Sequence, residues 1–171
     1  MRRVVVTGMG LLTTLGNNLD TSLMKIFHKK TRNMVRKGLK QNFSVCIDNS
    51  SEALKALHSI HSDNMLRLNG IAKPLSVFES IPKIFNPYKD YNLYLAKSDG
   101  KIISGLLLFY FKDKVEYFTP ATLPEFQNKQ PLSQLIFTAM LDAIRNHNSR
   151  YWNWGGTWKS QSGVYNFKRR W

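Results

Sequence analysis

Three strand-like segments follow one another between residues 91 and 121, and this run limits the possible folds more than any other feature. The segments are YNLYLAK at 91–97, KIISGLLLFYF at 101–111 and VEYFTPA at 115–121. The connections between them, at 98–100 and 112–114, are short and polar. Short polar connections favour hairpins, so these segments predict an antiparallel meander.

A helix and one further strand are expected after the meander. Pro131 suits the first turn of this helix, and apolar residues then recur at helical intervals. They are Leu132, Leu135, Ile136, Ala139, Met140, Ala143 and Ile144. YWNW at 151–154 is typical of a short strand. A strand, a long helix and a strand in succession form a crossover, so YWNW should lie parallel to VEYFTPA.

The segment before the meander begins with a basic helix. Residues 21–41 have apolar residues at helical intervals and no acid between Thr21 and Ile47. Seven cations lie on this helix: Lys25, Lys29, Lys30, Arg32, Arg36, Lys37 and Lys40. Repulsion between them costs helix stability, which indicates an anionic partner; a solvated basic face is the alternative.

Three shorter elements are expected between this helix and the meander. FSVCID at 43–48 alternates like a strand. Asn49 and Glu52 resemble a capping box that begins a helix running to about Arg67. LSVFESIPKIF at 75–85 predicts a short helix cut by Pro82.

The charge of the chain also favours an anionic partner. Its 171 residues suit one domain, and 25 Lys+Arg against 11 Asp+Glu give a net charge of +14. A cofactor with phosphates, RNA or an acidic lipid face would fit, and so would a basic surface that only aids solubility.

Cys46 is the only cysteine, which excludes an intrachain disulfide and a cysteine-rich zinc site and fits the reducing cytoplasm. The scattered histidines predict no metal site, and no apolar run approaches the roughly 20 residues of a membrane span.

The first residues form a separate leader. MRRVVVTGMGLLTTLGN at 1–17 lacks a signal-peptidase pattern, and Thr13 replaces the third glycine of a dinucleotide-binding turn. Residues 1–18 resemble the start of β-ketoacyl-acyl-carrier-protein synthases. The catalytic cysteine of that family has no match, since Cys46 is typical of a small buried residue. We therefore expect a ketosynthase-like leader at 1–18 outside the core, and one domain at 19–171.

The order of elements in this domain is similar to the GNAT acyltransferase fold, an α/β fold with a mixed sheet. In that fold the antiparallel meander is followed by a parallel strand that splays away, and the acyl donor lies between the splayed strands. The sequences that carry a closer resemblance are RNMVRKGLK at 32–40, the turn at 98–101, EYF at 116–118, NWGGT at 153–157 and GVYNFKRRW at 163–171. They resemble the BioF2-like, FemAB-type branch, whose members transfer amino acids from aminoacyl-tRNA to peptidoglycan precursors, or acyl groups to other amines. The resemblance implies an acyltransferase that uses acyl-CoA or aminoacyl-tRNA as donor substrate and has no tightly bound cofactor.

The resemblance also implies a set of site residues. The donor-binding residues carried over are Gly155, Gly156, Tyr165, Phe167 and Lys168, with Lys168 at the donor's phosphates. Glycines permit close backbone approach, and a lysine supplies a point charge. Arg32, Arg36 and Lys37 are expected to bind the same anionic donor, and Glu116 is expected to act as general base. The alternatives are a plain turn at the two glycines and core packing for Trp152, Trp154 and Trp158.

Two departures from the family pattern carry further expectations. QNKQPLSQ at 127–134 lacks the glycine-rich phosphate loop of general acetyltransferases, so binding of coenzyme A by that loop is not predicted. Larger relatives carry two such domains and continue past FKRRW. A second acyltransferase domain or subunit is thus an expected partner, and the domain is expected to be incomplete at its C-terminus, with the YWNW edge uncovered. A non-catalytic nucleic-acid-binding module and an inactive fusion or fragment remain the other interpretations.

Overall fold

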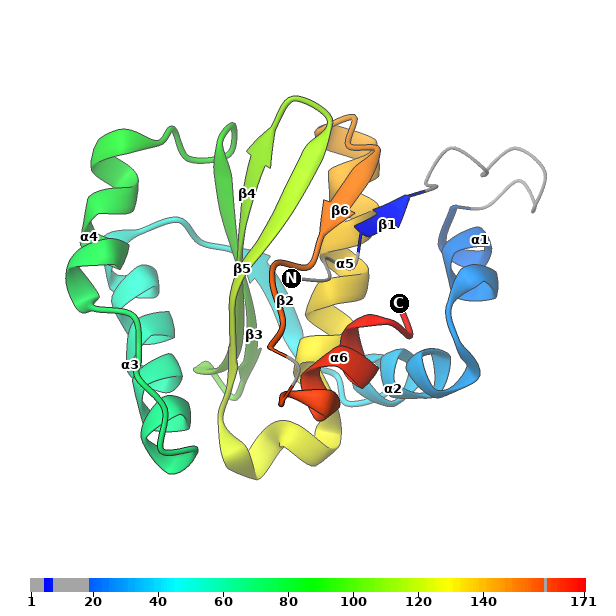
Figure 1. Cartoon of the computed structure of the whole chain (residues 1–171), viewed down its shortest axis with the longest axis horizontal. Helices are drawn as coiled ribbons and strands as arrows, with labels where there is room; N and C mark the ends of the chain where they lie inside the picture. Colours follow the sequence, from blue (N-terminus) through cyan, green and yellow to red (C-terminus); the bar gives the residue numbers. More distant parts are fainter. Residues whose placement is uncertain (1–4, 8–18, 159) are drawn as a thin grey trace.

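The computed structural model describes residues 5–7, 19–158 and 160–171. Six strands in these ranges form one mixed sheet with the order β1-β6-β5-β4-β3-β2. Helices α3 and α4 cover one face of the sheet, α5 covers the other, and α1 and α2 lie outside α5 (Figure 1). No helix in the described ranges is both long and apolar enough to cross a membrane. The expected α/β class with a mixed sheet is confirmed.

The meander is confirmed. Strands β3 (Tyr91–Ser98), β4 (Lys101–Phe111) and β5 (Lys114–Thr122) pair antiparallel in chain order. Asp99 and Gly100 both have positive φ, of 50° and 78°, which suits the two-residue turn that matches strand twist. Strand β2 (Ser44–Ile47), inside the expected 43–48 segment, pairs antiparallel with β3.

The crossover is confirmed as well. A 3-10 helix, η2 (Pro124–Lys129), leads from β5 to α5 (Pro131–Asn146), which begins at the expected proline. Strand β6 (Tyr151–Asn153) then pairs parallel with β5. The apolar stripe of α5 packs into the larger of two core clusters.

The basic segment forms two helices, so the prediction of one continuous helix is wrong. Helix α1 (Leu19–Ile26) ends before His28, and α2 (Lys29–Leu39) begins after it. His28 caps α2, because its Nδ1 accepts a hydrogen bond from Lys30 N at 3.1 Å. Its own N–H donates to Arg170 O at 3.0 Å. This bond to a residue far along the chain favours a break where local spacing predicts none.

Two helix boundaries differ from the sequence pattern. Helix α3 (Ser51–Arg67) is capped by Ser50, whose hydroxyl accepts from Ala53 N at 3.2 Å. Asn49 is buried, and its Oδ1 accepts from Leu93 N of β3 at 2.8 Å. Helix α4 (Leu75–Ile84) is not cut at Pro82 but runs two residues beyond it. A proline in the last turn removes one helical hydrogen bond and leaves the earlier turns intact.

The β6 edge is covered, so the expectation of an uncovered YWNW edge is wrong. Strand β1 (Val5–Thr7) pairs antiparallel with β6, with Val5 opposite Asn153 and Thr7 opposite Tyr151. These residues belong to the expected leader and supply backbone partners on the outer side of β6. The rest of the leader, including the Gly8–Gly10 turn, lies outside the described residues.

Three tryptophans join the C-terminal segment to the core. Trp152, Trp154 and Trp171 are all buried, which confirms core packing for the first two. Helix α6 (Ser162–Lys168) leads to Trp171, whose ring centre lies 5.2 Å from that of Phe27 and 6.0 Å from that of Trp154. Arg170 O also accepts a hydrogen bond from Thr31 Oγ1 at 3.0 Å. Together these contacts hold α6 between the sheet and α2.

Trp171→Ala is expected to destabilise the protein by about 3–5 kcal/mol, because it removes a large buried side chain and leaves a cavity. Trp158 is 73% exposed, so Trp158→Ala is the matched control and should change stability by about 0.5 kcal/mol or less. Urea denaturation of the two variants measures both effects. Equal losses of stability would show that the C-terminal tryptophan is not part of the core.

Candidate functional site

Strands β5 and β6 separate after a short parallel pairing, and we call the opening between them the fork. They pair at three positions, the last of which joins Glu116 and Asn153. Strand β5 continues to Thr122 without a partner on this side among the described residues. The chain after β6 turns away at Gly155, whose φ is +68° and favours glycine. The fork therefore opens toward the carboxyl end of β5, as the expected splayed strand requires.

A carboxylate lies where the fork begins. Asn153 Nδ2 donates to Glu116 Oε2 at 2.5 Å, and Asn153 Oδ1 accepts from Gly155 N at 3.0 Å. Asn153 thus fixes both the Glu116 carboxylate and the backbone turn. A Cβ atom added at Gly155 would lie 3.6 Å from Glu116 Oε1, so the glycine approaches the carboxylate closely. The structure brings Glu116 and Gly155 together. It also places Asn153 at the site, a residue that the sequence indicated only by its position in NWGGT.

Lys168 anchors the segment that leaves the fork. It is the last residue of α6 and is only 7% exposed. Its Nζ donates to Gly156 O at 3.2 Å and to Thr157 Oγ1 at 3.0 Å. Burial lowers the pKa of Lys168, and the nearby charge of Glu116 acts in the opposite direction. Lys168 therefore supports the chain just after the fork, and two of the three N–H groups of its ammonium already bind protein. Its contact with the donor's phosphates stays a prediction.

The other two α6 residues expected at the site differ in exposure. Phe167 packs its ring against Trp154 and Trp171, with ring centres 6.2 Å and 6.0 Å away. Tyr165 is 40% exposed, and the Arg169 guanidinium lies 6.0 Å from the centre of its ring. Phe167 holds α6 on the core, whereas Tyr165 faces outward.

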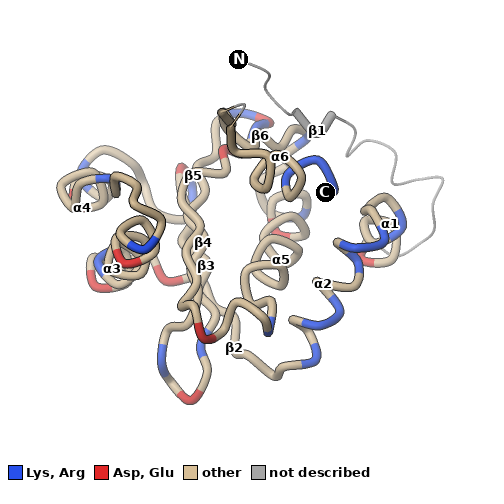
Figure 2. Tube along the Cα trace, turned by 60° about the horizontal axis from the view of Figure 1, so that its bottom comes forward, with Lys and Arg blue, Asp and Glu red and all other residues tan. Residues whose placement is uncertain are grey.

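The basic helix α2 meets the N-terminus of α5. A Cβ atom at Gly38 would lie 2.6 Å from Gln130 O, so only a glycine permits this approach. Arg36 and Lys37 precede Gly38 and are exposed, while Arg32 is half-buried. Figure 2 shows basic residues along α1 and α2, two helices that are separated from the sheet by α5. Arg36 and Lys37 thus lie one or two residues from the Gly38 contact with the N-terminus of α5, and a helix N-terminus favours anions.

An open apolar pocket reaches the fork from the opposite face of the sheet. It has a volume of about 540 Å³ and lies between α4 and strands β4 and β5. Phe109 and Phe118 contribute to its wall, and Glu116 lines it too. Glu116 is thus shared between this pocket and the fork. The sequence pattern did not indicate the pocket, because it forms only where α4 packs beside strands β4 and β5, and periodicity does not show how these elements pack.

Two histidines of α3 hold the loop that borders this pocket. His61 Nε2 accepts from Lys73 N at 3.2 Å, and His58 Nε2 is 3.1 Å from Lys73 O. Burial, the charge of Lys73 and that of His58 together lower the pKa of His61 to about 4, so His61 is neutral at pH 7. Lys73 Nζ then lies 4.9 Å from the centre of the Phe118 ring. The helical spacing of the two histidines therefore lets both bind the backbone of Lys73 in this loop. Among the described residues, no group of three His, Cys, Asp or Glu could hold a metal ion.

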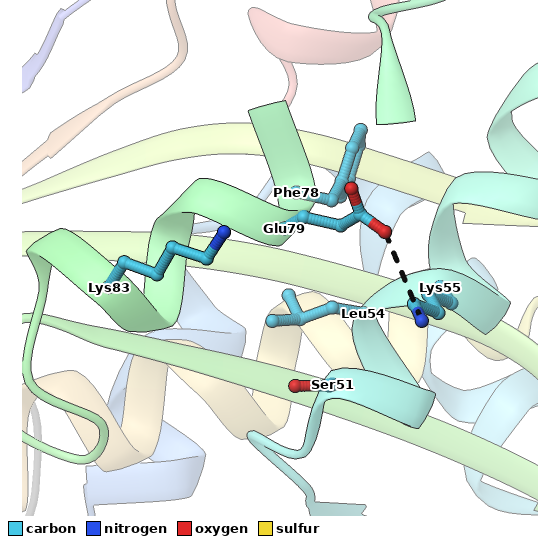
Figure 3. A pocket seen from close by; sticks show the side chains of 6 residues that line it. All are labelled: Ser51, Leu54, Lys55, Phe78, Glu79 and Lys83. Atoms are coloured by element: carbon cyan, nitrogen blue, oxygen red, sulfur yellow. Dashed lines mark ion pairs between the residues drawn. The ribbon is translucent and has the colours of Figure 1, made fainter. Parts of the chain in front are cut away.

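A second, smaller hollow lies between α3 and α4, away from the fork. Figure 3 shows its six lining side chains, with Lys55 Nζ and Glu79 Oε1 paired at 3.9 Å. Its volume is about 280 Å³. None of the residues expected at the site lines it.

Comparison with solved structures supports the fold. FemX superposes with a TM-score of 0.79 at 18% identity, over 99% of this chain and 57% of the FemX chain. The aminoglycoside acetyltransferase meta-AAC0020, from an uncultured soil metagenomic sample, gives a TM-score of 0.59 at 13% identity, over 77% of this chain and 88% of its own. The C-terminal domain of a putative lysylphosphatidylglycerol synthetase from Agrobacterium fabrum gives 0.56 at 14% identity, over 99% of this chain and 51% of its own. The chain thus spans little more than half of FemX, and at these identities the likeness shows the fold.

Sequence comparison identifies the family. No curated protein matches the chain. The model of the acetyltransferase (GNAT) domain matches residues 27–169. None of the comparisons supports the resemblance of residues 1–18 to ketosynthases, and the family match begins after them. The chain belongs to the GNAT acetyltransferase domain family.

Proposed function

We propose that the protein transfers an acyl or aminoacyl group from acyl-CoA or aminoacyl-tRNA to an amine, with Glu116 as general base. The observation that carries this proposal is the position of Glu116, which lines both the fork and the apolar pocket. A donor carbonyl in the fork and an acceptor amine in the pocket would meet beside this carboxylate. The resemblance to FemAB-type proteins supports an aminoacyl donor and a role in making cell-wall or cell-surface precursors. We place this reaction in the cytoplasm.

The chemistry requires one proton acceptor and one oxyanion donor. An amine reaches the site as an ammonium ion, so it must lose a proton before its nitrogen can attack the donor carbonyl. Glu116 accepts this proton, the C–N bond forms, and the C–S or C–O bond to the donor breaks. The leaving thiolate or ribose oxygen takes a second proton from the new amide nitrogen. Backbone N–H groups at the open edge of β5 are suited to stabilise the oxyanion.

The donor's phosphates would lie at the junction of α2 and α5. Arg36 and Lys37 are exposed beside Gly38, which contacts the N-terminus of α5. The side chains and the helix terminus both favour negative charge there. This placement needs no glycine-rich loop at residues 127–134. The 57% coverage of FemX is consistent with a second acyltransferase domain or subunit as partner.

Glu116→Gln is expected to lower kcat for acyl transfer about 10²- to 10⁴-fold and to leave donor affinity nearly unchanged, because glutamine cannot accept the proton. Glu79→Gln is the matched control, since it changes only the ion pair with Lys55 in the smaller hollow. Release of free thiol or deacylated tRNA measures the rate. A full rate in Glu116→Gln would remove Glu116 from the chemistry.

Reversal of Arg32, Arg36 and Lys37 to glutamate is expected to weaken donor binding at least about tenfold and to flatten its salt dependence, because phosphate contacts release counterions. Reversal of Lys112, Lys114 and Arg150, which are exposed beside the β4–β5 hairpin, changes the net charge equally and serves as control. Fluorescence titration at about 50 and 200 mM salt compares the two variants. Equal losses would make α2 an ordinary basic surface. Binding of uncharged tRNA alone, with no acyl transfer, would favour the nucleic-acid-binding module.

Lys168→Ala is expected to destabilise the protein by about 1–3 kcal/mol, because it leaves the carbonyl of Gly156 and the hydroxyl of Thr157 without their donor. A solvated lysine would contribute little stability, whereas Lys168 is only 7% exposed. Donor affinity should also fall about tenfold, because the loop at the fork loses its anchor. Arg169→Ala, next to it and exposed, is the control. Thermal denaturation and calorimetry measure the two effects, and an unchanged melting temperature would mean that the anchor is not needed.

A further inference from the structure

The residues that line the apolar pocket indicate which kind of amine could bind beside Glu116. Half of the ten residues that line it are aromatic. The ring centre of Phe109 lies 5.0 Å from that of Phe85 and 5.1 Å from that of Phe118, with tilted and edge-to-face geometry. Aromatic contacts of this kind favour a rigid floor. The pocket is therefore shaped for an apolar group.

Part of this aromatic surface faces solvent. Phe111 is 70% exposed and Phe85 is 39% exposed. Apolar surface is more stable when it is removed from water, so a ligand that covered these rings would gain affinity. A polyhydroxylated ligand would instead place hydroxyl groups against rings that cannot accept their hydrogen bonds well.

The charged residues that line the pocket are acidic, although the chain as a whole is basic. Two carboxylates, Asp90 and Glu116, line it, and no Lys or Arg is among the described residues that do so. Hydrogen bonds from the backbone and side chain of Asn86, at 2.9 Å and 2.8 Å, lower the pKa of Asp90, which is therefore ionised at neutral pH. The two charged side chains that line the pocket are thus both negative, and they favour a ligand with a positive charge.

The rings at the border of the pocket already attract ammonium groups. Lys73 Nζ lies 4.9 Å from the centre of the Phe118 ring, and Lys112 Nζ lies 5.4 Å from that of Phe111. Neither lysine lines the pocket. Both contacts are within the distance at which a cation is stabilised by an aromatic face.

We propose that the acceptor is an amine with an apolar aryl or alkyl body, which packs on the phenylalanine floor with its nitrogen toward Glu116. The role of this amine as the acyl acceptor rests on the proposed acyl transfer. Binding of the amine in the pocket does not depend on that reaction. The pocket thus selects for amines that are apolar beside the reacting nitrogen and against sugar-like amines and apolar acids.

Calorimetry on the full chain, without donor, tests the ligand class. Three probes test the need for an apolar body and the need for an amine separately. They are 2-phenylethylamine, glucosamine as a polar amine, and 3-phenylpropionate as an apolar acid. We expect 2-phenylethylamine to bind at least about tenfold more tightly than either other probe. Equal affinity for glucosamine or for 3-phenylpropionate would overturn the proposal.

A variant locates the binding. Phe111→Ala changes an exposed side chain and should leave the fold intact, yet it is expected to weaken binding of 2-phenylethylamine about fivefold or more. Leu66→Ala, at a residue that is 76% exposed and outside the pocket, is the matched control and should have no effect. Unchanged affinity in Phe111→Ala would overturn the assignment of this pocket. If 2-phenylethylamine binds as expected but receives no acyl group from either donor class, the amine site stands and the proposed acyl transfer fails.

Discussion

The parallel pairing of β5 and β6 stops after three residues, and the positions of the other site groups depend on this early separation. If the pairing continued along β5, the edge beyond Glu116 would be covered by backbone hydrogen bonds and closed to a ligand. Gly155 permits the separation, because a positive φ of 68° turns the chain away from β5. Asn153 then bonds both Glu116 and Gly155 N, so the carboxylate and the turn hold each other in place.

The separated segment needs its own support, and the C-terminal residues supply it. Lys168 binds the carbonyl of Gly156 and the hydroxyl of Thr157, while Trp171 packs on Phe27 and Trp154. The aromatic and basic character of residues 151–171 therefore has two different roles. The tryptophans of β6 and the C-terminus belong to the core, and the buried lysine replaces the strand contacts that the fork lacks. The exposed cations of α2 remain available for an anionic donor.

The elements that the sequence predicts well are those set by local patterns. Short polar turns and alternating strands indicate the meander, and the apolar stripe after Pro131 indicates α5 and its crossover. The errors arise where distant residues decide the structure. The break at His28 involves Arg170 O, Asn49 is drawn into the core by Leu93 N, and the β6 edge is covered by β1. In the site, Glu116 and Gly155 were expected. Three features were not: the two hydrogen bonds of Asn153, the burial of Lys168 and the phenylalanine pocket. They depend on contacts between different elements, which the spacing of residues along the chain does not indicate.

The central claim is that the fork holds the reacting end of the donor beside Glu116, and NMR titration of the ¹⁵N-labelled protein tests it most directly. The probes are a thioether analogue of acyl-CoA and an amide analogue of the aminoacyl-adenosine end of tRNA, neither of which can transfer its acyl group. The amide signals of Gly155, Gly156 and Phe118 are expected to shift at saturation with one of these analogues, while those of β2, on the far edge of the sheet, stay in place. Shifts confined to α2, or absent from the fork with both analogues, would contradict the claim.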